Sequence, residues 1–161
     1  MNASPPAPPL LLYSRTCQHA LRAMERLAAA ERGRPGALSS LAALAGQIGV
    51  SPAALAQIVA RLRRAGLLTA RRGPSGGVRL ARRATEISVL EVVRAVDGTD
   101  LEGRCILGFP ACGDETPCPA HPVWKEARAM LEARLESRSL ADLARSVAHK
   151  NAAVSARRRR R

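Results

Sequence analysis

The chain has 161 residues, a formal net charge of +13, and one residue each of Phe, Tyr and Trp. This length suits one domain with a modest core, built mainly from alanine, leucine and valine. No stretch approaches the roughly 20 apolar residues of a membrane span, and the proline-rich start lacks the features of a signal peptide. We therefore expect a cytoplasmic protein without a membrane partner, whose thiols stay reduced.

The positive charge is concentrated in the first half of the chain. Between Arg32 and Thr85 there are ten arginines and no acidic residue, whereas eleven of the thirteen acidic residues follow Thr85. A folded, basic segment without acids points to nucleic acid or to an anionic membrane. A solvated basic face is the alternative.

Helices are predicted first along the chain. Residues 1–12 form a proline-rich tail that we expect to be disordered. Apolar residues then recur at helical spacing over 14–31, and Gly33 stops this helix. Ser39 or Ser40 can cap a second helix.

A third helix follows a tight turn at Gly49. Ser51 and Pro52 provide a capping residue and a proline at the first helical position, and Gly66 ends the helix. Its inner stripe comprises Leu55, Ile58, Val59 and Leu62.

The spacing of apolar residues then changes from a helical period to the alternation of a strand. Residues 67–71 and 78–81 are short strand candidates, joined by the glycine-rich tip at 73–77. Ser88 can cap a fourth helix over 89–96.

The second half contains a loop and two helices. A cysteine-bearing loop spans 99–121, with too many glycines and prolines for a helix or a central strand. Helices are predicted over 122–136 and 139–147, so that 122–149 forms one helical unit. Residues 150–161 are predicted to be a disordered basic tail.

Residues 13–98 therefore have the order of a winged helix-turn-helix. The predicted fold class is mainly α-helical with a small β-hairpin wing and a long helix after it. The third helix would enter the major groove of double-stranded DNA, with Gln57 reading a base and Arg61 near phosphates. The candidate DNA-binding residues are Ser51, Ala53, Ala54, Gln57, Arg61, Arg71, Arg72, Gly73, Pro74 and Ser75. The alternative is a helical bundle with a basic hairpin that binds nothing.

Three cysteines and one histidine lie close together in the 99–121 loop. The candidate metal ligands are Cys105, Cys112, Cys118 and His121. Thiolates with one imidazole can hold a [2Fe-2S] or a [4Fe-4S] iron–sulfur cluster. Zinc is the weaker alternative, because structural zinc prefers ligand pairs spaced by two to four residues. Unligated thiols are a third possibility, and Cys17 is expected only to pack in its helix.

Several motifs together resemble the IscR/NsrR-type regulators, which are Rrf-type winged-helix transcription factors. In chain order they are Ala45-x-x-x-Gly-Val-Ser, Arg61-Leu-Arg-Arg-Ala-Gly-Leu-Leu, Arg72-Gly-Pro-Ser-Gly-Gly, Glu91-Val-Val-x-Ala-Val-Asp-Gly and the three cysteines. The resemblance spans about Tyr13 to Ser146. It implies a homodimer with the long helix as its interface, and a cysteine loop that can hold an iron–sulfur cluster. The apolar stripe on that helix agrees: Trp124, Ala127, Leu131 and Leu135.

The chain also departs from that family. Ala54 and Ala56 stand where members often carry an aromatic and an acidic residue, so the operator sequence cannot be transferred. Gln18 stands where nitric-oxide sensors can supply a carboxylate, which leaves His121 as the fourth ligand.

Three functions follow from these features. The first is a sequence-specific DNA-binding transcriptional regulator that senses iron–sulfur, redox or nitric oxide status. The second is a basic architectural DNA-binding protein with a zinc-stabilised loop. The third, an electron carrier or redox enzyme, is disfavoured because the chain has no nucleophile–base pair, phosphate loop or dinucleotide fingerprint.

Overall fold

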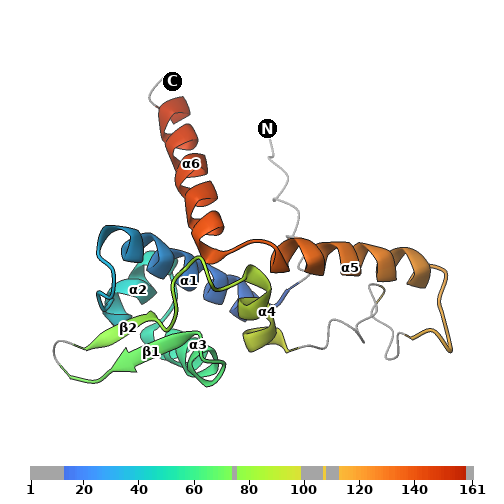
Figure 1. Ribbon diagram of the computed structural model, residues 1–161, viewed down its shortest axis with the longest axis horizontal. Coiled ribbons are helices and arrows are strands. Elements are labelled where there is room, and N and C mark those ends of the chain that lie inside the picture. The colour runs from blue at the N-terminus through green and yellow to red at the C-terminus, as the bar shows by residue number, and fades with distance from the viewer. Residues whose placement is uncertain (1–12, 74–75, 99–106, 108–112, 159–161) are drawn as a thin grey trace, which may run out of the picture.

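The structure is a computed structural model that describes residues 13–73, 76–98, 107 and 113–158. Its elements are α1 (Arg15–Gly33), α2 (Leu41–Ile48), α3 (Pro52–Arg64), β1 (Leu68–Arg71), β2 (Gly77–Leu80), α4 (Val89–Asp97), α5 (His121–Glu136) and α6 (Leu140–Arg158). This mainly helical fold with a two-stranded hairpin confirms the predicted fold class (Figure 1). Among the described helices none is long and apolar enough alone to cross a membrane. Only α2 and α3 taken together have the required length and composition, and the angle between them is 106°.

Serine side chains cap the helices of the winged region. Ser40, not Ser39, caps α2. At the start of α3 the Ser51 hydroxyl accepts a hydrogen bond from the backbone N–H of Ala54 at 3.2 Å. Ser88 forms a reciprocal capping box with Glu91 at the start of α4. Gly49, with a φ of 74°, allows the left-handed turn between α2 and α3. These local signals explain why the predicted and observed elements agree within two residues as far as α5.

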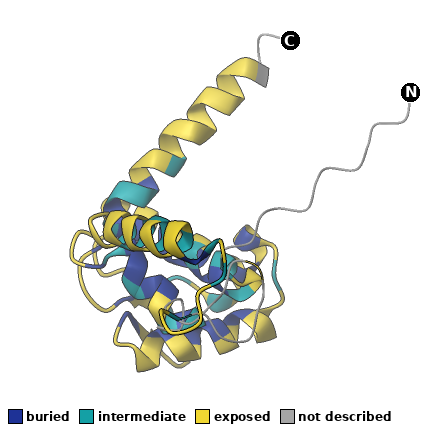
Figure 2. Ribbon diagram, turned by 90° about the vertical axis from the view of Figure 1, so that its right-hand side faces the viewer, coloured by how far each residue is buried: buried dark blue, intermediate teal, exposed yellow. Residues whose placement is uncertain are grey.

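The core lies around α1, which packs against α4 and α6. The predicted inner stripe of α3 is buried there, from Leu55 to Leu62. Figure 2 shows the buried residues between the helices and the exposed ones outside them. Cys17 is fully buried in this core, and burial, with a smaller contribution from Asp97, raises the pKa of its thiol to about 12. The thiol is therefore protonated and inert at neutral pH.

The hairpin is anchored to the segment between α1 and α2. β1 and β2 pair antiparallel with Leu68 opposite Leu80 and Thr69 opposite Arg79. Ser39 adds one further bridge to Val78. At Gly77 a Cβ atom would lie 2.4 Å from the carbonyl oxygen of Ser39, so only glycine permits this approach.

A second backbone contact joins the end of α5 and the start of α6 to the segment before α4. The N–H of Val89 donates to the carbonyl oxygen of Arg138 at 2.8 Å. The N–H of Leu140 donates to the carbonyl oxygen of Ile87 at 2.9 Å. The N–H of Ala141 donates to Ala84 at 3.1 Å. From this 84–89/138–141 junction α5 runs to one side and α6 rises away from the body (Figure 1).

The prediction of a disordered tail from residue 150 is wrong for residues 150–158, because α6 continues to Arg158. Alanine, lysine and arginine have high helix propensity, and no glycine or proline follows Pro122. The side chains of residues 148–157 are exposed, so this part of the helix relies on propensity and not on packing. The predicted tails at 1–12 and 159–161 lie outside the described residues.

Candidate DNA interface and cysteine loop

The outer face of α3 is exposed along its whole length. Burial of the Leu55–Leu62 stripe leaves Ala53, Gln57 and Arg64 on the opposite side of the helix. All of the predicted DNA-binding residues on α3 are exposed, although the hydroxyl of Ser51 is already used as a helix cap. The exposed face carries small side chains around one amide, so another molecule could approach it closely.

Arg61, which was predicted to lie near phosphates, has a partner within the chain. Its Nη1 atom donates a hydrogen bond to the carbonyl oxygen of Val96 at 3.0 Å, which links α3 to α4. The sequence placed this side chain near phosphates, but the structure gives it an intramolecular partner. Arg63 and Arg64 are the other cations of α3, and both are exposed.

A groove of about 540 Å³ separates α3 from the hairpin. It is bordered by the start of α2 at Ser40, by Arg63 of α3, and by Arg71, Arg72 and the turn at Gly73. Arg63 adds a cation that the sequence analysis missed. Helical spacing gives the signal for it, because residues 56, 60 and 63 lie on the flank of α3 toward the hairpin. Pro74 and Ser75, also predicted to bind DNA, lie outside the described residues.

The arginines beside this groove have no acidic partners. Arg63, Arg64, Arg71 and Arg72 make no side-chain hydrogen bond or ion pair with any described residue, and all four are exposed. Such an unneutralised group of cations attracts a polyanion, and the attraction weakens with salt.

The described part of the cysteine loop contains two of the four predicted ligands. Cys118 is a half-buried free thiol, and His121 is 7% exposed at the start of α5. The backbone N–H of His121 donates to the carbonyl of Cys118 at 2.9 Å, which holds both residues in one turn. Cys105 and Cys112 lie outside the described residues.

Asp114 sits between the imidazole of His121 and the ammonium of Lys125. His121 Nε2 lies 3.0 Å from Asp114 Oδ1, and Lys125 Nζ lies 2.9 and 2.7 Å from the two carboxylate oxygens. The hydrogen bonds from Lys125 first, and from His121 second, lower the pKa of Asp114. The carboxylate thus fixes the imidazole through Nε2, as carboxylates fix metal-ligating histidines in other proteins.

This geometry restricts how a metal could use His121. A bond from the ring requires the other nitrogen, Nδ1, or displacement of Asp114. Within the described residues no three His, Cys, Asp or Glu side chains are close enough to hold a metal ion. The donor types nevertheless fit a cluster, because Cys118 and His121 provide a thiol and an imidazole with two residues between them.

The apolar stripe on α5 is half-buried within the single chain. Trp124, Ala127 and Leu131 are partly covered, and Leu135 packs against the core. Arg94 of α4 lies 3.8 Å from Glu132 and 4.0 Å from Glu136, so ion pairs accompany this packing. The large apolar residues that α5 leaves exposed are Val123 and Met130, at 71% and 65%. They are seven residues apart and therefore share a helix face that the sequence analysis missed.

The chain is similar to a known protein family and to several transcriptional regulators. The sequence model of a family described as Rrf2, iron-dependent transcriptional regulator, matches residues 13–146. A candidate HTH-type transcriptional regulator of Mycobacterium tuberculosis, Rv1287, is 38% identical over 133 residues, covering 81% of this chain and 80% of that protein. The HTH-type transcriptional regulator IscR of Aliivibrio salmonicida is 35% identical over 103 residues, covering 64% of this chain and 61% of IscR.

Solved structures show the same arrangement of elements. CymR, the global cysteine regulator of B. subtilis, superposes with a TM-score of 0.69 at 27% identity, covering 85% of this chain and 98% of CymR. IscR of T. potens gives a TM-score of 0.64 at 29% identity, covering 85% of this chain and 88% of that one.

Proposed function

Because this chain belongs to the Rrf2 family of transcriptional regulators and is not an enzyme, we propose that it binds operator DNA as a homodimer and senses iron–sulfur, redox or nitric oxide status through a cluster on its cysteine loop. The observation that supports DNA binding most directly is the groove between α3 and the hairpin. Its exposed arginines have no acidic partner in the described chain, and they flank a helix face of small residues.

Each part of this surface has a distinct role in the proposal. α3 enters the major groove, where the amide of Gln57 can make two hydrogen bonds to an adenine edge. The small side chains of Ala53 and Ala54 let the helix approach the bases. Arg63 and Arg64 from α3, with Arg71 and Arg72 from the hairpin, contact phosphates and fix the register.

The cysteine loop is proposed to hold the sensor. When bound, an iron–sulfur cluster would supply an iron centre that reacts with oxidants and nitric oxide. Cys118 would provide a thiolate and His121 an imidazole, while Asp114 and Lys125 orient the ring. The loop joins α4 to α5, so its order bears on where α5 lies and how two DNA-binding units are spaced in a dimer.

The homodimer is proposed to use α5. Val123 and Met130 are the exposed apolar residues of this helix, and the half-buried stripe from Trp124 to Leu135 lies beside them. A twofold partner that covers both would bury apolar surface that single chains leave in water.

A zinc-stabilised architectural DNA-binding protein is the second candidate. The spacing of Cys118 and His121, with two residues between them, suits a zinc ligand pair. Under this alternative the metal stabilises the loop and DNA is covered without sequence preference.

Three measurements on the full chain, purified without oxygen, separate these functions. The cluster proposal predicts a brown protein with visible absorption that air or nitric oxide bleaches, and a footprint confined to a short palindromic site. Operator affinity of holo and apo protein at equal salt should differ roughly 5- to 150-fold, the range of a coupling of about 1–3 kcal/mol. Colourless protein with stoichiometric zinc and a uniform footprint would establish the architectural alternative.

A further inference from the structure

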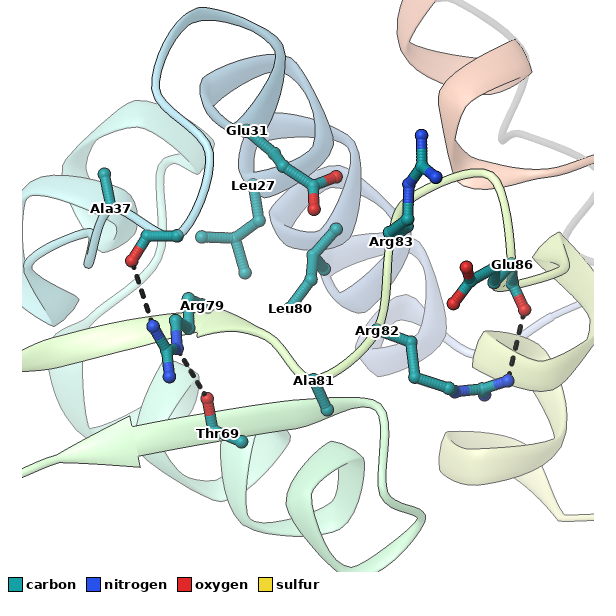
Figure 3. Close-up of a pocket in the computed structure, with 11 residues that line it drawn as sticks. Leu27, Glu31, Ala37, Thr69, Arg79, Leu80, Ala81, Arg82, Arg83 and Glu86 are labelled. Atoms are coloured by element: carbon teal, nitrogen blue, oxygen red, sulfur yellow. Dashed lines mark hydrogen bonds between the residues drawn. The ribbon is translucent and has the colours of Figure 1, made fainter.

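A second cavity, of about 390 Å³, lies behind the hairpin, away from the proposed DNA groove. Thr69 and Arg79 form its wall on the sheet, and this cross-strand pair faces the opposite side from Ala70 and Val78, which border the groove. The end of α1 and the turn at 81–86 close the other sides (Figure 3). The hairpin therefore borders both the cavity and the groove.

Three charged side chains of this cavity are held in place by the chain itself. Arg79 donates from Nε to Thr69 at 3.3 Å and from Nη1 to the carbonyl of Gly36 at 3.2 Å. Arg82 donates to the carbonyl of Glu86 and to the carboxylate of Glu91, and Glu31 accepts from the N–H of Ala84 at 2.9 Å. Their positions are fixed before any ligand arrives, which lowers the entropy cost of binding.

Two further charged side chains have no partner in the described chain. Arg83 and Glu86 flank a turn closed by a backbone hydrogen bond of 2.8 Å, and neither side chain makes a hydrogen bond or ion pair with another described residue. Figure 3 shows both on the turn at 81–86, beside Glu31, which accepts from the N–H of Ala84 in the same turn. The cavity thus offers three guanidinium groups and two carboxylates, with Leu27, Leu80 and Ala81 as apolar lining.

This mixture of charges selects the chemistry of a ligand. A simple anion would meet two carboxylates, and a simple cation would meet three guanidinium groups. A small molecule that carries both charges satisfies both sets, with its carbon skeleton on the apolar lining. We propose that this cavity binds a free α-amino acid, with its carboxylate on Arg83 and Arg79 and its ammonium on Glu86.

The site would communicate with DNA binding through the hairpin. Arg79 stands on β2, and Arg71 and Arg72 follow along the same hairpin toward its tip. A ligand that engages Arg79 therefore acts on the element that carries two of the proposed phosphate contacts, and the cavity becomes an effector site distinct from the cysteine loop.

Calorimetric titration of the full-length chain, without DNA, tests the site independently of the proposed function. The probes are the proteinogenic L-amino acids one at a time, then the N-acetyl and carboxamide derivatives of the tightest binder, and inorganic phosphate. At least one amino acid should bind, and removing either of its charges should weaken binding about tenfold or more. The variants Arg83→Ala and Glu86→Gln should each cause a similar loss, because neither side chain holds the fold, while Arg134→Ala on α5 should bind as the natural chain does.

Three results would overturn the proposal. They are no heat from any amino acid, phosphate binding as tightly as the best amino acid, or unchanged affinity in both cavity variants. Thermal unfolding of each variant checks that the loss is not caused by misfolding.

Discussion

The carboxylate of Asp97 accepts two hydrogen bonds from Ser14, one from its backbone N–H at 2.8 Å and one from its hydroxyl. The same serine caps α1, because its hydroxyl oxygen accepts from the N–H of Cys17 at 3.0 Å. Ser14 therefore connects the start of α1 to the last residue of α4, directly before the cysteine loop.

The first prediction concerns this connection. Ser14→Ala removes a helix cap and one bond to Asp97, so it should lower the free energy of unfolding by about 1–2 kcal/mol in urea denaturation. Ser40→Ala is the matched control. It removes a capping hydrogen bond of 3.5 Å from the N–H of Ala43, and the Ser40 hydroxyl has no second partner among the described residues. Equal losses in the two variants would show that the bond to Asp97 contributes nothing.

The second prediction separates the arginines of α3. Arg63→Ala and Arg64→Ala should weaken operator binding and each reduce the slope of log affinity against log salt by roughly one. Arg61→Ala should leave that slope unchanged and instead destabilise the fold by about 1 kcal/mol, because it loses the bond to Val96. Fluorescence anisotropy over a salt series measures the slopes, and a reduced slope for Arg61→Ala alone would reverse the assignment.

The third prediction concerns base reading. Gln57→Ala should cost about 1–3 kcal/mol at the operator and relax the preference at one base position. The affinity of both proteins for a set of operators with single base changes measures this preference. A uniform loss across all of them would assign Gln57 to the DNA backbone.

The fourth prediction concerns the thiols. Cys118→Ala should abolish the visible absorption of protein purified without oxygen, and Cys17→Ala should retain it, because Cys17 is buried in the core. Iron and sulfide analysis of the two variants gives the stoichiometry. Colour that survives Cys118→Ala would remove this residue from the ligand set.

The fifth prediction concerns assembly. Met130→Glu should give monomers in sedimentation and weaken operator binding, yet leave the far-ultraviolet circular dichroism unchanged, because this side chain is exposed in the single chain. Leu135→Glu should disturb folding as well, since Leu135 packs on the core. A dimer that persists in Met130→Glu would place the interface elsewhere.

Sequence patterns predicted the local features of this chain and missed its long-range contacts. The caps at Ser51 and Ser88 were predictable because each serine bonds to a backbone group three residues away. The partners of Arg61 and Asp97 are 35 and 83 residues away, so no local pattern indicates them. The placement of Arg61 near phosphates relied on the helix alone, whereas α4 decides where its guanidinium goes.

The cysteine loop shows the same division. The thiols and imidazole proposed as ligands were visible in the sequence, but the position of Asp114 between His121 and Lys125 depends on how the loop turns back onto α5. The exposed Met130 was missed for a related reason: the most continuous apolar stripe of α5 is the one that packs partly within the chain, and Met130 lies outside it.

The 84–89/138–141 junction fixes one end of α5, so that this helix can tilt only about that end. Backbone hydrogen bonds hold the end of α5 there, next to the turn that borders the cavity behind the hairpin. With its 16 residues α5 is about 24 Å long at 1.5 Å per residue, so a tilt of about 5° at the junction moves its far end by about 2 Å. That far end carries His121 and Lys125. A small rotation at the junction would therefore cause a larger displacement at the His121 end of α5. A displacement at that end would cause only a small rotation at the junction.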